Sequence, residues 1–455
     1  MVIASSFGAV DPSSHEVKAD MTKTAERTGN ERRSNTTLNM IGDLGVEGSE
    51  GRPRYDTASR FASSAFHYFD RYSDPVTGLV KDSSCNESSA SIAGTGMALS
   101  CFAIAAELGY LDREEAARRA LLSLRFLSGT GFHGFFYHFM EPRTGRRAGR
   151  SEISTIDSAI LFAGALSAAE YFDGDTDTER DIRILGEQIY LDADWEWASP
   201  RPPLVSHGWT PERGFLRYDW RGYNEALLLY ILALGSPTHP VPTPAYDQWL
   251  SSYKWKSIYG YELVYGGPLF LHQTAHSWID FRGIQDSYMR EKGIDYFENS
   301  RRATHVQREY AVRNPRNFAG YGENCWGVSA STGPGSGRFH SYRARGVPFG
   351  PDDGTISSWA TAASLPFAPE IVLPALEYLE GAHSSRDGFA PCFNQSFSTG
   401  DGTGYWMAAH SYAIDQGPIL MMIENHRSGL MWNLLRRSPH VRRGLERAGF
   451  TGGWL

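Results

Sequence analysis

The sequence predicts an all-α protein of about twelve helices arranged as a double ring, six inside and six outside. Three observations support this fold class. Apolar residues recur at three- and four-residue intervals along most of the chain after Arg54, the spacing of helices with one buried face. Alternating strand patterns are few and short, the clearest being at 259–265. Long loops connect the helical segments, which suits a double ring whose inner helix ends surround a pocket.

The helix expected at 112–127 shows how each element is recognised. Asp112 and Glu115 have the spacing of a capping box, which marks a helix start. After them, Ala117, Leu121 and Leu124 keep a three-and-four spacing, so one face of this helix is core. Similar patterns predict the remaining helices at 55–72, 88–108, 155–173, 176–192, 221–235, 243–252, 271–289, 293–313, 354–363, 369–381 and 414–436.

The loops between these helices are rich in Gly, Pro and aromatic residues. The longest are at 129–151, 194–219, 314–353 and 383–412. Loops of this length in a compact unit are usually functional or disordered, and their aromatic content favours function. We expect one domain over residues 51–455, preceded by a flexible polar leader at 1–50. A helical solenoid has the same local periodicity, but no fixed repeat is visible.

The composition limits the classes of ligand. The 44 basic and 52 acidic residues give a net charge of −8 and form no basic block, so nucleic acid is not an expected partner. The 24 Phe, 23 Tyr, 12 Trp and 47 Gly residues suit a groove for a neutral, hydroxyl-rich ligand such as an oligo- or polysaccharide. A large core with many turns accounts for part of this content. The oligomeric state is left open.

No segment of the chain reaches the length of a membrane span. The first ten residues lack a basic region and a long apolar run, and Asp11 follows soon after. We therefore expect no secretion signal and a cytoplasmic location, with the periplasm as the alternative. The four cysteines lie far apart and indicate neither a disulfide framework nor a zinc site.

Glu225 is the first candidate for catalysis, because it lies beside Trp220, Arg221 and Tyr223 at the start of an apolar helix. Poor solvation raises the pKa of such a carboxyl and suits it to donate a proton near neutrality. Arg221 opposes that rise if its side chain points inward. For a single acid, satisfying the free amides of the helix start is the more common role.

Other acids in similar settings favour a cavity ringed by carboxylates, the usual chemistry of a site that cleaves sugars. Asp415 is the first choice for the second carboxylate, although capping its helix is about as probable. Glu152 and Asp157 can face one cavity if the helix starts near Thr155, and Glu323 is a reserve candidate.

His272, His276 and Asp280 share one face of a predicted helix. The segment lacks the Glu of a His-Glu-x-x-His motif, so we expect hydrogen bonding to sugar or core rather than a metal. No cofactor loop is recognised, and no cofactor is expected. The expected substrate contacts are Phe135, Tyr137, His138, Trp209, Trp220, Arg221, Tyr223, His276, Trp278, Asp280, Arg282, Trp326, Asp353 and Tyr405.

A series of motifs occurs in order along the chain: Ser91–Gly96, Gly134–His138, Glu152–Asp157, Trp220–Glu225, Leu234–Pro240, Trp278–Gly283, Tyr321–Asn324, Pro348–Gly354 and Ile414–Pro418. Over residues 54–450 this series resembles the glycoamylase (glucoamylase-like) family, which includes endo-β-1,2-glucanases and the carboxy-terminal domain of cyclic β-1,2-glucan synthases. The resemblance implies an (α/α)6 toroid that acts on β-linked glucan without a cofactor, with Glu225 and Asp415 as the important acids.

The leading hypothesis is therefore a glycoside hydrolase that cleaves β-1,2-glucan or sophoro-oligosaccharides. One alternative is a transglycosylase that cyclises or extends the same glucan. The alternative from another class is a non-catalytic glucan-binding module, which has little need for several buried acids.

Overall fold

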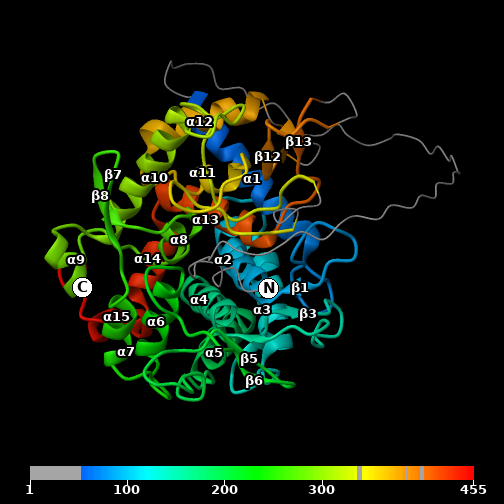
Figure 1. The fold of residues 1–455 in the computed structure, drawn as a ribbon. Helices are drawn as coiled ribbons and strands as arrows, with labels where there is room; N and C mark the ends of the chain where they lie inside the picture. Colours follow the sequence, from blue (N-terminus) through cyan, green and yellow to red (C-terminus); the bar gives the residue numbers. More distant parts are fainter. Residues whose placement is uncertain (1–52, 336–340, 383, 386–387, 400–403) are drawn as a thin grey trace, which may run out of the picture.

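The computed structural model describes residues 53–335, 341–382, 384–385, 388–399 and 404–455. The leader expected at 1–50 lies outside these ranges. Within them the chain forms fifteen α-helices and thirteen short strands (Figure 1). One continuous hydrophobic core includes residues from Ala58 to Phe450.

Six helical segments form the inner ring: α2 (Ile92–Glu107), α4 (Thr155–Tyr171), α6 (Ala226–Gly235), α8 (Phe270–Gln273), α11 (Ser358–Ala362) and α13 (Ala413–Arg427). The ring is closed. Helix α2 packs on α4, α4 on α6, and α6 on η2 (Ala275–Ser277), which follows α8. Gln273 of α8 donates a hydrogen bond to the Ala360 carbonyl of α11 at 2.6 Å. Helix α11 then packs on α13, and α13 on α2.

The outer ring alternates with the inner one along the chain. It comprises α1 (Pro53–Tyr72), α3 (Arg113–Leu127), α5 (Asp177–Leu191), α7 (Pro244–Leu250), α10 (Tyr296–Arg313) and α12 (Pro369–Ala382). Helices such as α3 and α10 bury one face only, whereas α2, α4 and α6 are buried on nearly all sides. This is the difference expected between a surface helix and an enclosed one. The predicted (α/α)6 toroid is therefore confirmed.

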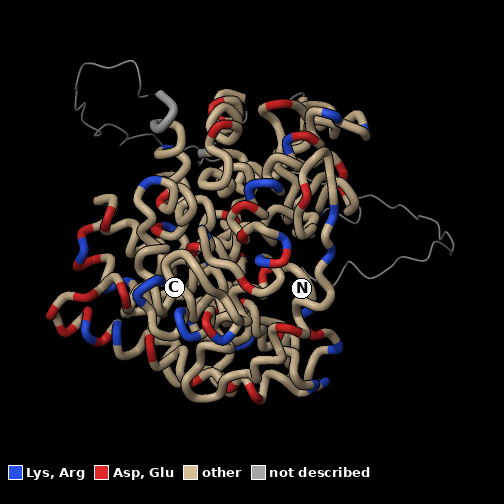
Figure 2. Tube along the Cα trace, turned by 90° about the vertical axis from the view of Figure 1, so that its left-hand side faces the viewer, with Lys and Arg blue, Asp and Glu red and all other residues tan. Residues whose placement is uncertain are grey.

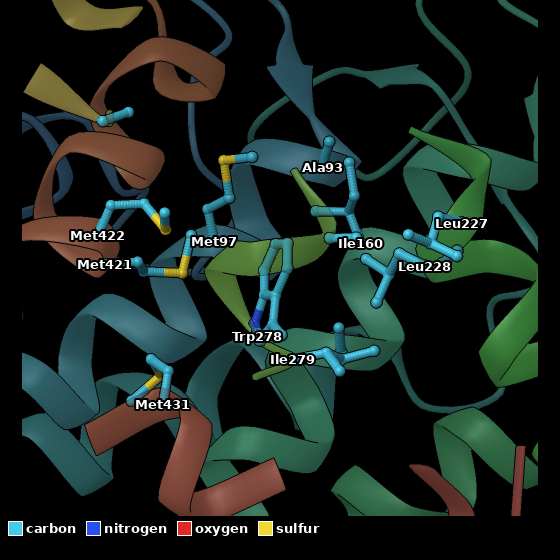
Figure 3. Close-up of a cluster of buried hydrophobic side chains, with 14 of the residues drawn as sticks. Ala93, Met97, Ile160, Leu227, Leu228, Trp278, Ile279, Met421, Met422 and Met431 are labelled. Atoms are coloured by element: carbon cyan, nitrogen blue, oxygen red, sulfur yellow. The ribbon is translucent and has the colours of Figure 1, made fainter. Parts of the chain in front are cut away.

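The centre of the ring is filled by side chains from different inner elements. Figure 3 shows Met97 of α2, Ile160 of α4 and Met421 of α13 around Trp278, which follows η2. The Trp278 indole donates to the Ser100 hydroxyl at 2.9 Å, so its one polar atom is satisfied within the core.

Two of the predicted helices are divided in the structure, and the helix predicted at 354–363 is confined to α11 (Ser358–Ala362), which follows strand β9 (Ile356–Ser357). The segment 271–289 is not one helix but α8, η2 and α9 (Ser287–Lys292). The chain turns between η2 and α9 at Gly283, where φ is +74°, and the Asp286 side chain then caps α9. The segment 414–436 is divided into α13 and α14 (Leu430–Arg437) at Gly429, where φ is +72°. Helix α15 (Pro439–Arg447), which packs on α6, was not predicted.

Short strands hold the loops at one end of the ring. The two-residue strands β1 (Ala90–Ser91), β4 (Ile153–Ser154) and β9 (Ile356–Ser357) each lead directly into an inner helix. The others are β2 (Phe136–Tyr137), β3 (Phe139–Met140), β5 (Gly208–Thr210), β6 (Gly214–Phe215), β7 (Trp255–Ile258), β8 (Tyr261–Val264), β10 (Ser384–Ser385), β11 (Gly388–Phe389), β12 (Cys392–Asn394) and β13 (Trp406–Met407). The strand predicted around 259–265 is confirmed as β8.

The largest of these sheets has the order β2-β4-β5-β6, and a second has the order β13-β12-β9. Ser91 and Ser154 end their strands and cap α2 and α4, accepting hydrogen bonds from the Gly94 and Asp157 amides. The inner helix starts are thereby fixed relative to the loops that cover them.

Acidic and basic residues are interspersed along the visible trace in Figure 2, which fits the modest net charge. Among the described residues, no helix combines the length and apolar character that a membrane crossing needs.

Helices α2 and α4 approach closely at Gly96 and Gly164. A Cβ added to Gly164 would lie 1.9 Å from the Gly96 carbonyl oxygen, and the obstacle is rigid backbone. We expect Gly164→Ala to lower the free energy of unfolding by about 1–3 kcal/mol, the usual cost of overpacking. Urea denaturation measures this loss. Gly381→Ala in α12 is the matched control, because nothing lies within 4 Å of its added Cβ. Equal stabilities of the two variants would contradict the close approach.

Candidate active site

One cavity lies where the inner helices begin. It is lined from α2, the start of α4, the segment before α6, α8, the start of α11 and the first turns of α13. Its lining residues are Met97, His138, Glu152, Ser154, Ile156, Asp157, Ile160, His207, Trp220, Glu225, Phe270, Gln273, Thr274, Ala330, Tyr342, Trp359, Ile414 and Pro418.

Glu225 projects into this cavity and has little compensation for its burial. Its side chain does not cap α6, and among the described residues its Oε2 atom has no hydrogen-bond partner. Only 7% of the residue is exposed. Burial is the main cause that raises the pKa of Glu225 to about 7, and the nearby charge of Asp157 adds to it. The carboxyl is therefore poised between its two protonation states near neutrality.

Two more polar atoms of the lining lack partners among the described residues. These are Oε1 of Gln273 and Nδ1 of His207. The His207 ring stacks on Trp220 with centroids 4.0 Å apart, and burial lowers the His207 pKa to about 4, so the ring is neutral. Buried polar groups are normally paired, and three unpaired ones facing one cavity indicate a polar ligand.

His138 lies between two carboxylates of the lining. Its Nδ1 lies 3.1 Å from Glu152 and its Nε2 lies 3.7 Å from Asp157. Burial opposes the charge on His138, but Asp157 and Glu152 outweigh it and raise the pKa of the ring. Burial likewise opposes ionisation of Glu152, yet the bond to His138 lowers the pKa of Glu152 to about 2. Glu152 is thus an ionised partner of His138.

Asp415 lies in the first turn of α13 and contacts Tyr342, which lines the cavity. It is buried and accepts a hydrogen bond from the Tyr342 hydroxyl at 2.5 Å. Ile414 and Pro418, on either side of it in sequence, line the cavity, but Asp415 does not. Burial raises the pKa of Asp415 well above its usual value, the Tyr342 bond opposes this, and the charge of Asp82 adds to it.

Asp82 is an acid that the sequence did not single out. Its carbonyl accepts the Ala413 amide at 2.9 Å, and the neighbouring Ser83 is bridged to Tyr412, so Asp82 lies beside the start of α13. Burial raises the pKa of Asp82 to about 6, His138 opposes this rise and Asp157 adds to it. Asp82 therefore interacts electrostatically with both His138 and Asp415. No local motif marks it, because only the fold brings these segments together.

Tyr342 belongs to a loop that a buried ion pair holds in place. The Arg345 guanidinium contacts Asp353 with two bonds of 2.7 and 2.9 Å and donates to the Ser331 carbonyl. Asp353, expected to contact substrate, instead fixes the loop that carries Tyr342.

Of the other expected substrate contacts, His138 and Trp220 line the cavity. Tyr137 and Trp209 are not among the residues that line the cavity. Both pair with Ile153 across the β2-β4-β5 sheet, so they share the face opposite Glu152 and Ser154. Arg221 is exposed, and Tyr405 donates to the Ala382 carbonyl.

Several other expected contacts are core residues that pack away from the cavity. Three of them are aromatic residues that are buried in the hydrophobic core: Phe135, Trp278 and Trp326. Tyr223 contacts His272, and His276 contacts Ser300. Asp280, which was also expected to contact substrate, pairs with Arg282 and Arg436.

The groups considered for a metal therefore have separate partners. Within the described ranges, no cluster of His, Cys, Asp or Glu has the arrangement of a metal site. Glu323 differs from the acids that line the cavity. Its side chain is 71% exposed and pairs with Arg308.

The raised pKa of Glu225 has a consequence for stability. A carboxyl with a folded-state pKa of about 7 and an ordinary value of 4.5 favours folding below pH 4.5 and loses that contribution as pH rises through 7. We expect Glu225→Gln to gain roughly 3 kcal/mol of stability relative to the wild type between pH 4 and pH 9. Urea unfolding across this range measures the difference. A difference that does not change with pH would mean that Glu225 ionises normally.

The protein is thus a closed double ring of helices with an acid-lined cavity where the inner helices begin. The sequence model of the Glycoamylase family matches residues 217–439. A glucoamylase-like protein from Bacteroides uniformis is 32% identical, with 90% of this chain and 100% of that chain covered and a TM-score of 0.82. The protein described here belongs to the glycoamylase (glucoamylase-like) family.

Two further relatives have more specific names. The endo-β-1,2-glucanase from Chitinophaga pinensis, solved with sophorotriose and glucose, is 27% identical over 88% of this chain and 99% of that one, with a TM-score of 0.80. An exo-β-1,2-glucooligosaccharide sophorohydrolase (non-reducing end) from Parabacteroides distasonis is 26% identical over 84% of this chain. The match spans 56% of the length of that curated relative.

Proposed function

We propose that this protein is a glycoside hydrolase that cleaves β-1,2-glucan or sophoro-oligosaccharides. The observation that carries the proposal is Glu225, a buried carboxyl with an unpaired oxygen and a pKa of about 7 inside an acid-lined cavity. Cleavage of a glycosidic bond requires one protonated carboxyl to assist the leaving oxygen and one ionised carboxylate to support the attacking group.

Glu225 is the proton donor in this proposal. Its Oε2 atom has no hydrogen-bond partner among the described residues, so a glycosidic oxygen can occupy that position and receive the proton as the bond to the anomeric carbon breaks. The neutral His207 ring and the Gln273 amide offer further bonds to sugar hydroxyls.

Asp415 is our candidate for the second carboxylate. Burial raises the pKa of Asp415 well above its usual value, and the hydrogen bond from Tyr342, which holds it at the start of α13, opposes that rise without cancelling it. The alternative within the cavity is Asp157, which the Ser154 hydroxyl and His138 both contact. Glu152 is left out of the reacting pair because its hydrogen bond to His138, at 3.1 Å, occupies it, whereas the contact between Asp157 and His138 is longer, at 3.7 Å.

The substrate assignment depends on the relatives. One is named for β-1,2-glucan and another for β-1,2-gluco-oligosaccharides, whereas the family name refers to glucoamylase. A panel of linear β-1,2-, β-1,3- and β-1,4-glucans and starch, with reducing-sugar assay, separates these. We expect release from β-1,2-glucan only. Release from starch alone would reject the substrate class while leaving hydrolysis intact.

A further inference from the structure

A hollow lies at the far end of α4 from the acids. Helix α4 begins at the acid-lined cavity, and its last turns line this hollow together with α5 and the junction of α14 and α15. The two spaces share no lining residue. The volume of the hollow is about 360 Å³. It is therefore a separate space, and the proposed hydrolysis does not use it.

The start of α15 brings unpaired polar groups to this hollow. Ser438 is the N-cap residue, lines the hollow and is 1% exposed, yet its side chain makes no capping bond. Its Oγ has no hydrogen-bond partner among the described residues. Pro439 has no amide hydrogen, and the first amide bonded at this helix start is that of Arg442, which donates to the Ser438 carbonyl at 3.1 Å. The amides of His440 and Val441 precede that bond, so the helix start offers a hydroxyl and two amides to an acceptor.

Two arginines line the same hollow, Arg183 of α5 and Arg437 at the end of α14. The Nη1 atom of Arg183 donates to the Phe172 and Gly174 carbonyls at 2.6 and 2.9 Å. Arg437 donates to the Glu170 carbonyl at 2.9 Å. These bonds hold both side chains beside the end of α4. Because a guanidinium has five N–H donors, each arginine keeps donors for a ligand.

The acids of the lining do not cancel this positive charge. Each already contacts a basic side chain: Glu170 lies 3.6 Å from Arg437, Glu187 lies 3.2 Å from His440 and Asp173 lies 3.1 Å from Arg113. The two bonds of Arg183 are to carbonyls, which leave its charge in place. The helix dipole adds a partial positive charge at the start of α15. The side of the hollow next to Ser438 is therefore suited to an anion.

Capping of α4 accounts for the arginines alone. Cations commonly bond the last carbonyls of a helix, and Arg183 and Arg437 do so here. That role leaves the Ser438 hydroxyl buried without a bond, which costs free energy. A tetrahedral oxyanion has acceptors for the hydroxyl, the amides and the guanidiniums at once. Helix starts and arginines are the groups that commonly bind phosphate in proteins.

We propose that this hollow binds a phosphate group, carried either by inorganic phosphate or by a small phosphomonoester. Its oxygens accept hydrogen bonds from the Ser438 hydroxyl and the first amides of α15, and Arg183 and Arg437 balance its charge. The volume of the hollow leaves room for a small organic group beside the phosphate. The site does not depend on the proposed hydrolysis.

The test is isothermal titration of the wild type with inorganic phosphate and, separately, with methyl phosphate at constant ionic strength. We expect one saturable site. Ser438→Ala is expected to weaken phosphate binding about tenfold, and Arg183→Gln by as much or more, because each removes a hydrogen bond to a charged group. Arg217→Gln, with the same loss of charge at an exposed position after β6, is the matched control and should leave binding unchanged.

Thermal denaturation separates a binding role of Ser438 from a capping role. Since its Oγ makes no bond in the free protein, Ser438→Ala is expected to keep the melting temperature of the wild type. Thr176→Ala removes a cap that does bond its helix, at 3.2 Å to the Glu179 amide, and is expected to lower the melting temperature. Ser438→Ala therefore tests the site even if Arg183→Gln, which also loses bonds to carbonyls, does not fold.

Absence of saturable binding of either phosphate by the wild type would overturn the proposal. Unchanged binding in folded Ser438→Ala would overturn it too. Tighter binding of inorganic phosphate than of methyl phosphate would identify the free ion as the ligand, and the reverse order would identify a phosphomonoester. Both orders support the site, provided that Ser438→Ala weakens the binding.

Discussion

Glu225→Gln is expected to abolish the release of reducing sugar from β-1,2-glucan, with kcat reduced about 10²–10⁴-fold. Glutamine has nearly the same shape but no acidic proton, so the leaving oxygen departs unassisted. For the same reason wild-type activity is expected to decline as pH rises through about 7, where Glu225 loses its proton. The pH profile of kcat/KM for the wild type measures this decline.

A substrate with a good leaving group distinguishes lost proton donation from lost structure. A dinitrophenyl sophoroside needs no protonation, so Glu225→Gln should retain most of the wild-type rate on it. Glu187→Gln, on the exposed side of α5, is the matched control and should leave both rates unchanged. Equal losses on both substrates would show that Glu225 supports the site without donating a proton.

Asp415→Asn is expected to reduce kcat by a similar factor, about 10²–10⁴. Asparagine can still accept the Tyr342 hydroxyl bond but cannot take a proton or attack. Tyr342→Phe removes the bond and leaves the carboxylate, so a smaller loss is expected there. Steady-state kinetics with β-1,2-glucan, together with thermal denaturation, separates an effect on chemistry from one on folding.

Chemical rescue identifies the second carboxylate. Azide should restore turnover in Asp415→Asn and not in Glu225→Gln, because a small anion replaces an attacking or supporting group rather than a proton donor. Rescue of Asp157→Asn alone would transfer the role from Asp415 to Asp157. The anomer that the wild type first releases from β-1,2-glucan, followed by NMR, reports the stereochemical course.

Most of the fold could be predicted because helix periodicity depends on local sequence. The helix predictions were wrong where contacts between distant segments decide the local conformation. The segment 271–289 has a helical spacing, yet Asp280 pairs with Arg282 and Arg436 and the chain turns at Gly283. The highly charged α15 was missed because its burial depends on a close approach to α6, where a Cβ at Gly444 would lie 2.0 Å from the Ile231 carbonyl oxygen.

The site was predicted in part. Acids beside helix starts pointed to Glu225, Glu152 and Asp157, which the structure brings to one cavity. Aromatic content was a poorer guide, since Trp278 and Trp326 are core residues. His207 and Tyr342 could not be found, because each enters the cavity from a loop whose position is set by contacts distant in sequence. For Tyr342, that contact is its hydrogen bond to Asp415.

The proposed mechanism requires that one carboxyl in the cavity, that of Glu225, holds a proton near neutrality. Difference infrared titration of the wild type against Glu225→Gln isolates the carboxyl band of this single side chain. The band is expected to titrate with a pKa of about 7, as its burial requires. A band that titrates near the ordinary value of 4.5 would remove the proton donor from the proposed mechanism.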